Sequence, residues 1–249
     1  GIIMLHTNLA DAASAIRDEF PDQLISITCS VYDDYKSGTN GYWINPVNGT
    51  ESSFLSGVLA GKMTKSNVIG VVAGYPVEST NLNVNAFIDG AKYVNPDIKA
   101  KVTFIESWFD PAKAREAAET QINTGADVIF AMMFGPFEAV SEHEVYGVGI
   151  YVDQQYLAPD SVLTSSMVYW DQHIKYLIDQ WWEKQANGVS YSSPEGQIYY
   201  SFAQGSSDIA PINEKIVPKE ISDYVMEIRQ KVLDGEIVVN MRPEAPESD

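Results

Sequence analysis

The chain has little positive charge and almost no cysteine. Its 249 residues include 16 Lys and Arg against 34 Asp and Glu, which gives a formal net charge of −18. A surface this negative repels nucleic-acid phosphates and anionic lipid head groups, so DNA, RNA and acidic membranes are not expected partners. The single cysteine, Cys29, cannot form an internal disulfide, and its place at the end of a predicted strand favours a buried structural thiol over a nucleophile.

Long apolar runs are missing as well, since none approaches the roughly 20 residues of a membrane span. The chain opens on a short apolar stretch, residues 1–5, which has neither the basic start nor the longer apolar core of a secretory signal. A helical pattern follows at once, so we interpret this opening as a buried strand. Residue 1 is then an abrupt place for a protein to begin.

The residue groupings typical of an enzyme are also missing. Residues 57–64 superficially resemble a phosphate-binding loop, but the spacing is one residue short and Met63 stands where a Ser or Thr should follow Lys62. We interpret this segment as a small-residue helix packed on a sheet. The Glu-His-Glu cluster at 142–144 is one short segment without a second ligand pair, which favours a solvated surface over a metal site. No nucleophile, base and orienting group can be assembled, so we expect neither catalysis nor a cofactor.

What the sequence does contain is an alternation of short, fully apolar runs with amphipathic stretches from Asn67 to Tyr151. This alternation is typical of βαβ units around a parallel sheet. Asp110 and Pro111 predict one helix start, because an Asp can cap the free amides and a Pro fits the first helical turn. The expected strands are 68–73, 102–105, 127–131 and 147–151, with helices near 82–94, 111–123 and 136–143 between them.

The first part of the chain predicts a piece of a second doubly wound lobe, so we expect a two-lobed α/β fold. That part has strands at 2–5 and 24–28 and helices at 10–19 and 52–63, and after residue 153 we expect strands at 162–164 and 196–202 and helices at 174–182 and 221–233. The expected division is lobe one over 1–66 and 155–190, lobe two over 67–154 and 191–240, and a polar tail over 241–249.

Aromatic side chains follow the ends of several predicted strands. In an open α/β sheet the ligand crevice lies at the carboxyl ends of the strands. Rings collected there suit a planar ligand held by stacking, although any one of them alone is more often a core residue. The residues are Trp108 and Phe109 after one strand, Phe134 after another, Tyr151 at the end of a third, and Trp170 after the Thr164-Ser165 pair.

Several segments, in order along nearly the whole chain, resemble the basic membrane protein family. This family consists of substrate-binding lipoproteins of ABC importers that take up nucleosides and purine bases. The resemblance is specific because it continues to the closing Asp-Gly-Glu of residues 234–236. The matching segments are 51–64, 68–74, 107–113, 125–129, 152–154, 158–160 and 162–165.

The resemblance implies a type I periplasmic binding protein fold, whose two lobes close over the ligand about crossovers expected near 65–67, 154–159 and 187–193. It also implies a purine-like ligand, a permease partner in the cell membrane, a monomer, and an extracytoplasmic place as an anchored lipoprotein or a periplasmic protein. The residues that we expect to wall or stack on the base are Trp108, Phe109 and Phe134, beside Tyr151, with polar contacts from Asn8, Asp11 and Asp153, and Trp170 at the mouth.

Two departures from the family pattern carry further expectations. Nucleoside-binding members usually have an acidic residue on the strand that here ends at Tyr151, and a lysine where this chain has Val168. A site loses affinity for hydroxyl groups when their partners become apolar, so we expect a free base such as adenine to be preferred over a nucleoside. Family members also normally begin with a lipid-modified cysteine and an initial strand-helix-strand run, so we expect the first lobe here to be incomplete at its N-terminus.

The alternative is a ligand-sensing regulatory or signalling module, because the same fold serves as the effector domain of transcription regulators. A helix-turn-helix or a basic face would favour it. The sequence shows neither, and the net charge of −18 argues against it.

Overall fold

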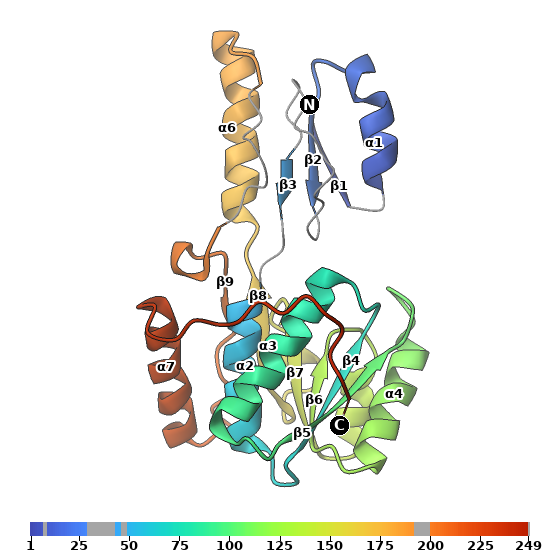
Figure 1. Ribbon diagram of the computed structural model, residues 1–249, viewed down its shortest axis with the longest axis vertical. Helices are drawn as coiled ribbons and strands as arrows, with labels where there is room; N and C mark the ends of the chain where they lie inside the picture. The colour runs from blue at the N-terminus through green and yellow to red at the C-terminus, as the bar shows by residue number, and fades with distance from the viewer. Residues whose placement is uncertain (7–8, 29–42, 46–48, 192–199, 249) are drawn as a thin grey trace. The chain divides into compact units, whose positions relative to one another are not determined.

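The computed structural model describes residues 1–6, 9–28, 43–45, 49–191 and 200–248. Asn8 and Cys29 lie outside these ranges, and so does most of the strand predicted over 196–202. The chain divides into two compact units, Gly1–Asn48 with Tyr169–Ser206 and Gly49–Val168 with Ser207–Asp249 (Figure 1). It therefore passes from one unit to the other after residues 48, 168 and 206.

The first unit is built on a parallel sheet in the order β1-β2-β3. Leu24 of β2 is fully buried against Leu177 and Tyr191, and this contact holds the long helix α6 on the sheet. The strand and helix predictions for 2–5, 10–19, 24–28 and 174–182 are confirmed. The elements are β1 (Ile2–His6), α1 (Ala10–Ile16), η2 (Arg17–Glu19), β2 (Leu24–Thr28), β3 (Trp43–Asn45), α6 (Asp171–Asn187) and η4 (Phe202–Gln204).

The second unit contains a six-stranded sheet in the order β5-β4-β6-β7-β8-β9. All neighbouring pairs are parallel except β8 with β9. The four strands predicted between 68 and 151 are confirmed with ends shifted by a few residues. The strands are β4 (Val68–Ala73), β5 (Lys99–Phe104), β6 (Val128–Ala131), β7 (Tyr146–Tyr151), β8 (Val162–Val168) and β9 (Ser207–Ile209).

Helices cover both faces of this sheet. On one face the ring of Phe87 stacks on that of Phe130 with centroids 4.4 Å apart, whereas the adjacent Ile129 packs with Ala114, Ala118 and Val140 on the other. This alternation places α3 on the face of the sheet opposite α4 and α5. The helices are α2 (Thr50–Met63), α3 (Glu78–Val94), α4 (Pro111–Asn123), α5 (Pro136–Glu142) and α7 (Lys219–Leu233), with the short turn η3 (Gln155–Leu157).

The small residues of α2 allow it to lie directly against α3 (Figure 1). A Cβ on Gly57 would come within 2.0 Å of the Phe87 carbonyl oxygen, and a Cβ on Gly90 within 1.9 Å of the Phe54 carbonyl oxygen. Residues 57–64 thus form a buried helix and its end, as the small-residue interpretation predicts.

The unit boundaries differ from the expected lobe boundaries. The sequence assigns the helix at 52–63 and the strand at 162–164 to lobe one, but α2 packs on α3, and β8 pairs with β7 in the second unit. The expected crossover at 65–67 is instead a turn within the second unit, and hydrogen bonds to Asp127 hold it in place. The backbone N–H groups of Lys65 and Ser66 donate to one carboxylate oxygen of Asp127, at 2.7 and 2.8 Å.

Two further expectations at the C-terminal side are corrected. Phe202 lies in η4 rather than in a strand, and the strand that is present nearby is β9. The polar tail is a packed segment, because Asn85 of α3 donates to the carbonyl oxygens of Arg242 and Glu244 at 2.8 and 2.9 Å. This segment continues past α3 to the edge strand β5, where the Val102 N–H donates to the Ser248 hydroxyl (Figure 1).

The predicted helix start at Asp110 is confirmed, since Asp110 Oδ1 accepts the N–H of Lys113 at 3.0 Å and Pro111 occupies the first turn of α4. Among the described residues, no helix combines the length and the hydropathy that crossing a membrane requires.

Candidate functional site

A cavity of about 240 Å³ opens at the carboxyl ends of β4, β6 and β7 in the second unit. This is the edge of an open parallel sheet at which ligands bind. None of the described residues that line the cavity is charged. The lining comes from Gly74, Thr80, Trp108, Ala131–Phe134, Ile150–Val152 and Gln154.

Trp108 forms one wall because Gly74 leaves room for it. A Cβ on Gly74 would lie 2.9 Å from Trp108 Cε3, closer than side-chain contacts allow. Tyr75 lies on another side of the indole, with ring centroids 5.0 Å apart. The indole is nevertheless 48% exposed. A flat aromatic surface is therefore held at the cavity by its neighbours and remains accessible to a ligand.

Phe134 forms another part of the wall, and Phe109 lies beside it. The two rings meet edge to face with centroids 6.1 Å apart. Phe109 itself is 71% exposed and is not among the lining residues. Phe134 also borders a second, open hollow of about 500 Å³, whose acidic rim is formed by Glu138 and Glu142.

The end of β7 has a strained backbone. Val152 N–H donates to the Ile150 carbonyl at 2.9 Å around Tyr151, whose φ is +68°. A three-residue turn with positive φ at its centre is rare outside glycine and costs energy, and such strain is concentrated at functional sites. Although Tyr151 is 42% exposed, burial of its hydroxyl raises the pKa of that group above its ordinary value.

Gln154 supplies a polar group to the otherwise apolar lining. Its residue surface is 5% exposed, and its Oε1 accepts the Ile150 N–H at 2.9 Å. Its own backbone N–H donates to Ser165 Oγ at 3.0 Å. The second polar group is the buried Thr80, in the first turn of α3. Since the remainder is aromatic and aliphatic, including the buried Met132 and Met133, the cavity suits a flat, mostly apolar body with a few polar atoms.

The structure brings three of the predicted site residues together at this cavity: Trp108, Phe134 and Tyr151. Phe109 contacts Phe134 at its outer side. Asp153 is exposed and is not a lining residue, and its carboxylate accepts the Gln155 N–H at 3.0 Å in the local turn. Trp170 and Asp11 belong to the first unit, and Asn8 lies outside the described residues. The ligand-binding role of all eight residues stays a prediction.

Sequence reasoning missed Thr80 and Gln154 as site residues. Gln154 follows the strand that ends at Tyr151 by three residues, which is the signal that singled out the aromatic residues, so a search for polar side chains there would have found it. Thr80 lies seven residues past the end of β4, within α3, where that signal does not reach.

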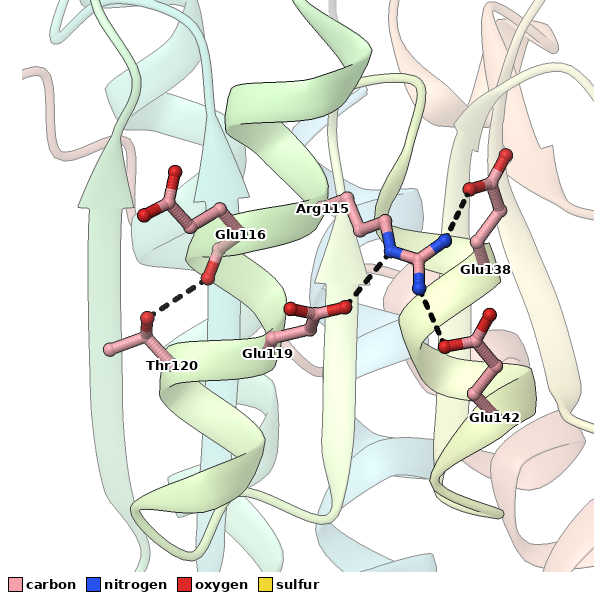
Figure 2. Close-up of polar contacts among 6 residues, drawn as sticks. All are labelled: Arg115, Glu116, Glu119, Thr120, Glu138 and Glu142. Carbon is pink, nitrogen blue, oxygen red and sulfur yellow. Dashed lines mark hydrogen bonds and ion pairs between the residues drawn. The ribbon is translucent and has the colours of Figure 1, made fainter.

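Charged groups gather next to the second hollow, around Arg115 of α4. Figure 2 shows its guanidinium reaching Glu119 on its own helix and Glu138 and Glu142 on α5, at 2.9, 2.8 and 2.6 Å. Hydrogen bonds that the guanidinium donates to Glu119 and then to Glu138 raise the pKa of Arg115 above its ordinary value. This pairing engages Glu142 of the Glu-His-Glu cluster, and in the described part of the chain no three His, Cys, Asp or Glu side chains are placed to hold a metal ion.

Comparison with protein families gives a match over nearly the whole chain. The model of the Bmp family, described as ABC transporter substrate-binding protein PnrA-like, matches residues 2–242. A purine-binding protein of Brucella abortus is 27% identical over 75% of this chain, which spans about half (51%) of that protein's length. The nucleoside-binding protein BmpA of Lactococcus lactis is 29% identical over 93% of this chain and 68% of its own.

Solved structures share the fold at lower identity. An ABC transporter solute-binding protein from Aeropyrum pernix superposes with a TM-score of 0.76 at 17% identity, over 97% of this chain and 78% of its own. A transcriptional activator of the comK gene from Bacillus halodurans gives the same TM-score at 22% identity, over 96% of this chain and 80% of its own. The α/β architecture is thus that of the type I solute-binding proteins.

Proposed function

The chain belongs to the PnrA-like family of ABC transporter substrate-binding proteins, and we propose that it binds a purine-type ligand, with a free base such as adenine preferred over a nucleoside. The ligand would then be handed to an ABC permease of the cell membrane. The names of the Brucella and Lactococcus relatives support the ligand class. The same proposal places the protein outside the cytoplasm, either anchored by a lipid or free. It also states that the protein acts as a monomer.

The observation that carries the proposal is the Trp108 indole held against Gly74 at the carboxyl edge of the sheet. Stacking of a base on such a ring contributes about 1–3 kcal/mol in nucleic-acid-binding proteins. Phe134 and Tyr151 add aromatic surface to the same cavity. The site is therefore suited to a planar heterocycle.

The preference for a base over a nucleoside is supported by the small number of hydrogen-bonding side chains in the described lining of the cavity. A ribose carries several hydroxyl groups that must keep hydrogen-bond partners when they leave water. The described lining offers two polar side chains, Thr80 and Gln154, and no carboxylate or ammonium group. Tyr151 ends the strand on which the family resemblance leads us to expect an acidic residue in nucleoside-binding members. A ligand with few polar atoms loses less on entering such a cavity.

Calorimetric titration of the purified protein with adenine, adenosine and glucose tests this function. We expect adenine to bind with a Kd about tenfold or more below that of adenosine, a difference of about 1.4 kcal/mol or more, and glucose to give no heat of binding. Equal or tighter binding of adenosine would refute the preference for the base. Binding of neither purine would refute the function. Native mass spectrometry of the untreated protein adds the mass of any ligand that co-purifies.

A second candidate, a ligand-sensing module, is favoured by one observation, the TM-score of 0.76 with the comK activator. The two functions make different demands on the ligand complex. A transport protein delivers its ligand to a reconstituted permease and stimulates ATP hydrolysis there, whereas a sensory module changes the activity of a regulatory partner. Ligand-dependent stimulation of ATPase activity in proteoliposomes would support the transport function.

A further inference from the structure

Gln154, which lines the cavity, is fixed in place by hydrogen bonds to two neighbouring strands. It lies three residues after the end of β7, its residue surface is 5% exposed, and its side chain and backbone each make a hydrogen bond to a different strand. Oε1 accepts from Ile150 of β7, and the backbone N–H donates to Ser165 of β8. Gly149 is part of the same arrangement, since a Cβ there would lie 2.5 Å from Gln154 Oε1.

These contacts fix which way round the carboxamide lies. A backbone N–H can be satisfied only by an acceptor, so the atom that meets the Ile150 N–H must be the oxygen. The amide nitrogen is then the atom left over, with two N–H donors. Nε2 has no hydrogen-bond partner among the described residues, and Gln154 lines the cavity. Nε2 is reached by solvent, so a ligand that enters the cavity displaces its water and must supply an acceptor in place of that water or leave the donor unpaired.

We propose that Gln154 is a specificity-determining residue, whose Nε2 donates a hydrogen bond to an acceptor atom of the ligand. The acceptor would be an unprotonated ring nitrogen or an exocyclic carbonyl oxygen of a planar heterocycle. The proposal rests on the function proposed above. It adds that the ligand atom facing Gln154 must be a hydrogen-bond acceptor. A ligand that presents an N–H or C–H at this point leaves the amide unpaired and is rejected.

Thr80 cannot perform the same selection. A hydroxyl donates or accepts according to how it rotates, so Thr80 accommodates ligand atoms of either polarity. The Gln154 amide cannot turn over without placing its N–H groups against the Ile150 N–H. The fixed group therefore discriminates between ligands, and the rotatable one tolerates them.

The substitution Gln154→Glu tests the proposal with little change of shape. A glutamate retains an oxygen for the Ile150 N–H and replaces the donor at the cavity by a second oxygen. Gln155→Glu is the matched control, since it adds the same charge one position along the chain, outside the described lining. We expect Q154E to weaken adenine binding at least about tenfold, which is 1.4 kcal/mol, and Q155E to leave it within about twofold, with similar midpoints of thermal unfolding for both.

The ligand side of the test uses 1-, 3- and 7-deazaadenine, each of which lacks one ring acceptor. One of the three should bind the unsubstituted protein at least about tenfold more weakly than adenine, and that difference should vanish in Q154E, as a double-mutant cycle requires. Adenine binding that is equal in Q154E and the unsubstituted protein overturns the role of Gln154 alone. Absence of adenine binding to the unsubstituted protein instead overturns the proposed function.

Discussion

Trp108 and Gly74 lie in contact at the carboxyl edge of the sheet. With the indole in this position, residue 74 has no room for a side chain. A Cβ on Gly74 would be 2.9 Å from Trp108 Cε3 and 3.0 Å from the Ser107 carbonyl oxygen. The backbones cannot separate easily, because the Glu106 N–H donates to the Gly74 carbonyl at 2.9 Å. The absence of a side chain on Gly74 therefore sets the position of the indole.

The substitution Gly74→Ala should displace the indole and weaken adenine binding about tenfold, within the 1–3 kcal/mol that stacking on one ring contributes. The measurement is calorimetric titration. Gly147→Ala is the matched control, since its Cβ would also meet an aromatic carbon, Phe137 Cε1, at 2.9 Å. Gly147 does not line the cavity, so this control should reduce stability and leave affinity unchanged. Equal affinity of G74A and the unsubstituted protein would contradict the role of the contact.

Removal of the rings themselves should separate Trp108 from Phe109. Trp108→Ala deletes a wall of the cavity and should weaken adenine binding by about 1–3 kcal/mol. Phe109→Ala deletes a ring that is 71% exposed and touches the cavity only through Phe134, so its effect should be at least about threefold smaller in Kd. Titration of both variants decides the matter, and a larger loss in F109A would show that the ligand binds elsewhere.

The sequence could group side chains in space where one physical rule applies to every strand, and their ligand-binding role stays a prediction. Carboxyl ends of parallel strands meet at one edge, so Trp108, Phe134 and Tyr151 could be grouped from sequence. The same rule could not exclude Phe109, which points outward from the next position, or show that Asp153 accepts a hydrogen bond in its own turn. The orientation of the Gln154 amide depends on a bond to Ile150, which no spacing reveals.

The fold prediction shows the same limit at larger scale. Apolar runs located β4, β6 and β7 because burial on both faces determines their composition. The unit to which α2 and β8 belong depends on close approaches such as that of Gly57 to the Phe87 carbonyl, which are decided in three dimensions. The packing of the polar C-terminal segment rests on side-chain amides binding backbone carbonyls, and carbonyls leave no mark in the sequence.

The two hydrogen bonds by which Asn85 holds the C-terminal segment should contribute measurably to the stability of the protein. Asn85 is 1% exposed, and its Nδ2 donates to both the Arg242 and the Glu244 carbonyl oxygens. Asn85→Ala should lower the free energy of unfolding in urea by about 1–3 kcal/mol. Amide exchange at Val102, which donates to Ser248 at the end of the segment, should accelerate. The exposed Asn187→Ala should change stability by less than about 0.5 kcal/mol. Equal stabilities of the two variants would contradict this contribution of the two hydrogen bonds.

Arg115 should couple α4 to α5 through charge. Arg115→Gln removes the partner of Glu119, Glu138 and Glu142 at once and leaves three carboxylates close together (Figure 2). We expect a lower midpoint of urea unfolding at low salt and a smaller difference at 1 M NaCl, where the screening length is about 3 Å. Lys219→Gln, which breaks a single exposed pair with Asp223, should have a smaller effect. A salt-independent loss would assign the role of Arg115 to packing instead.

A crystal structure of the protein with adenine tests the account most directly. We predict the base in the cavity at the ends of β4, β6 and β7, against the indole of Trp108, with one of its acceptor atoms within hydrogen-bond distance of Gln154 Nε2. Adenine bound away from these residues, or a cavity that stays empty at saturating adenine, would contradict it.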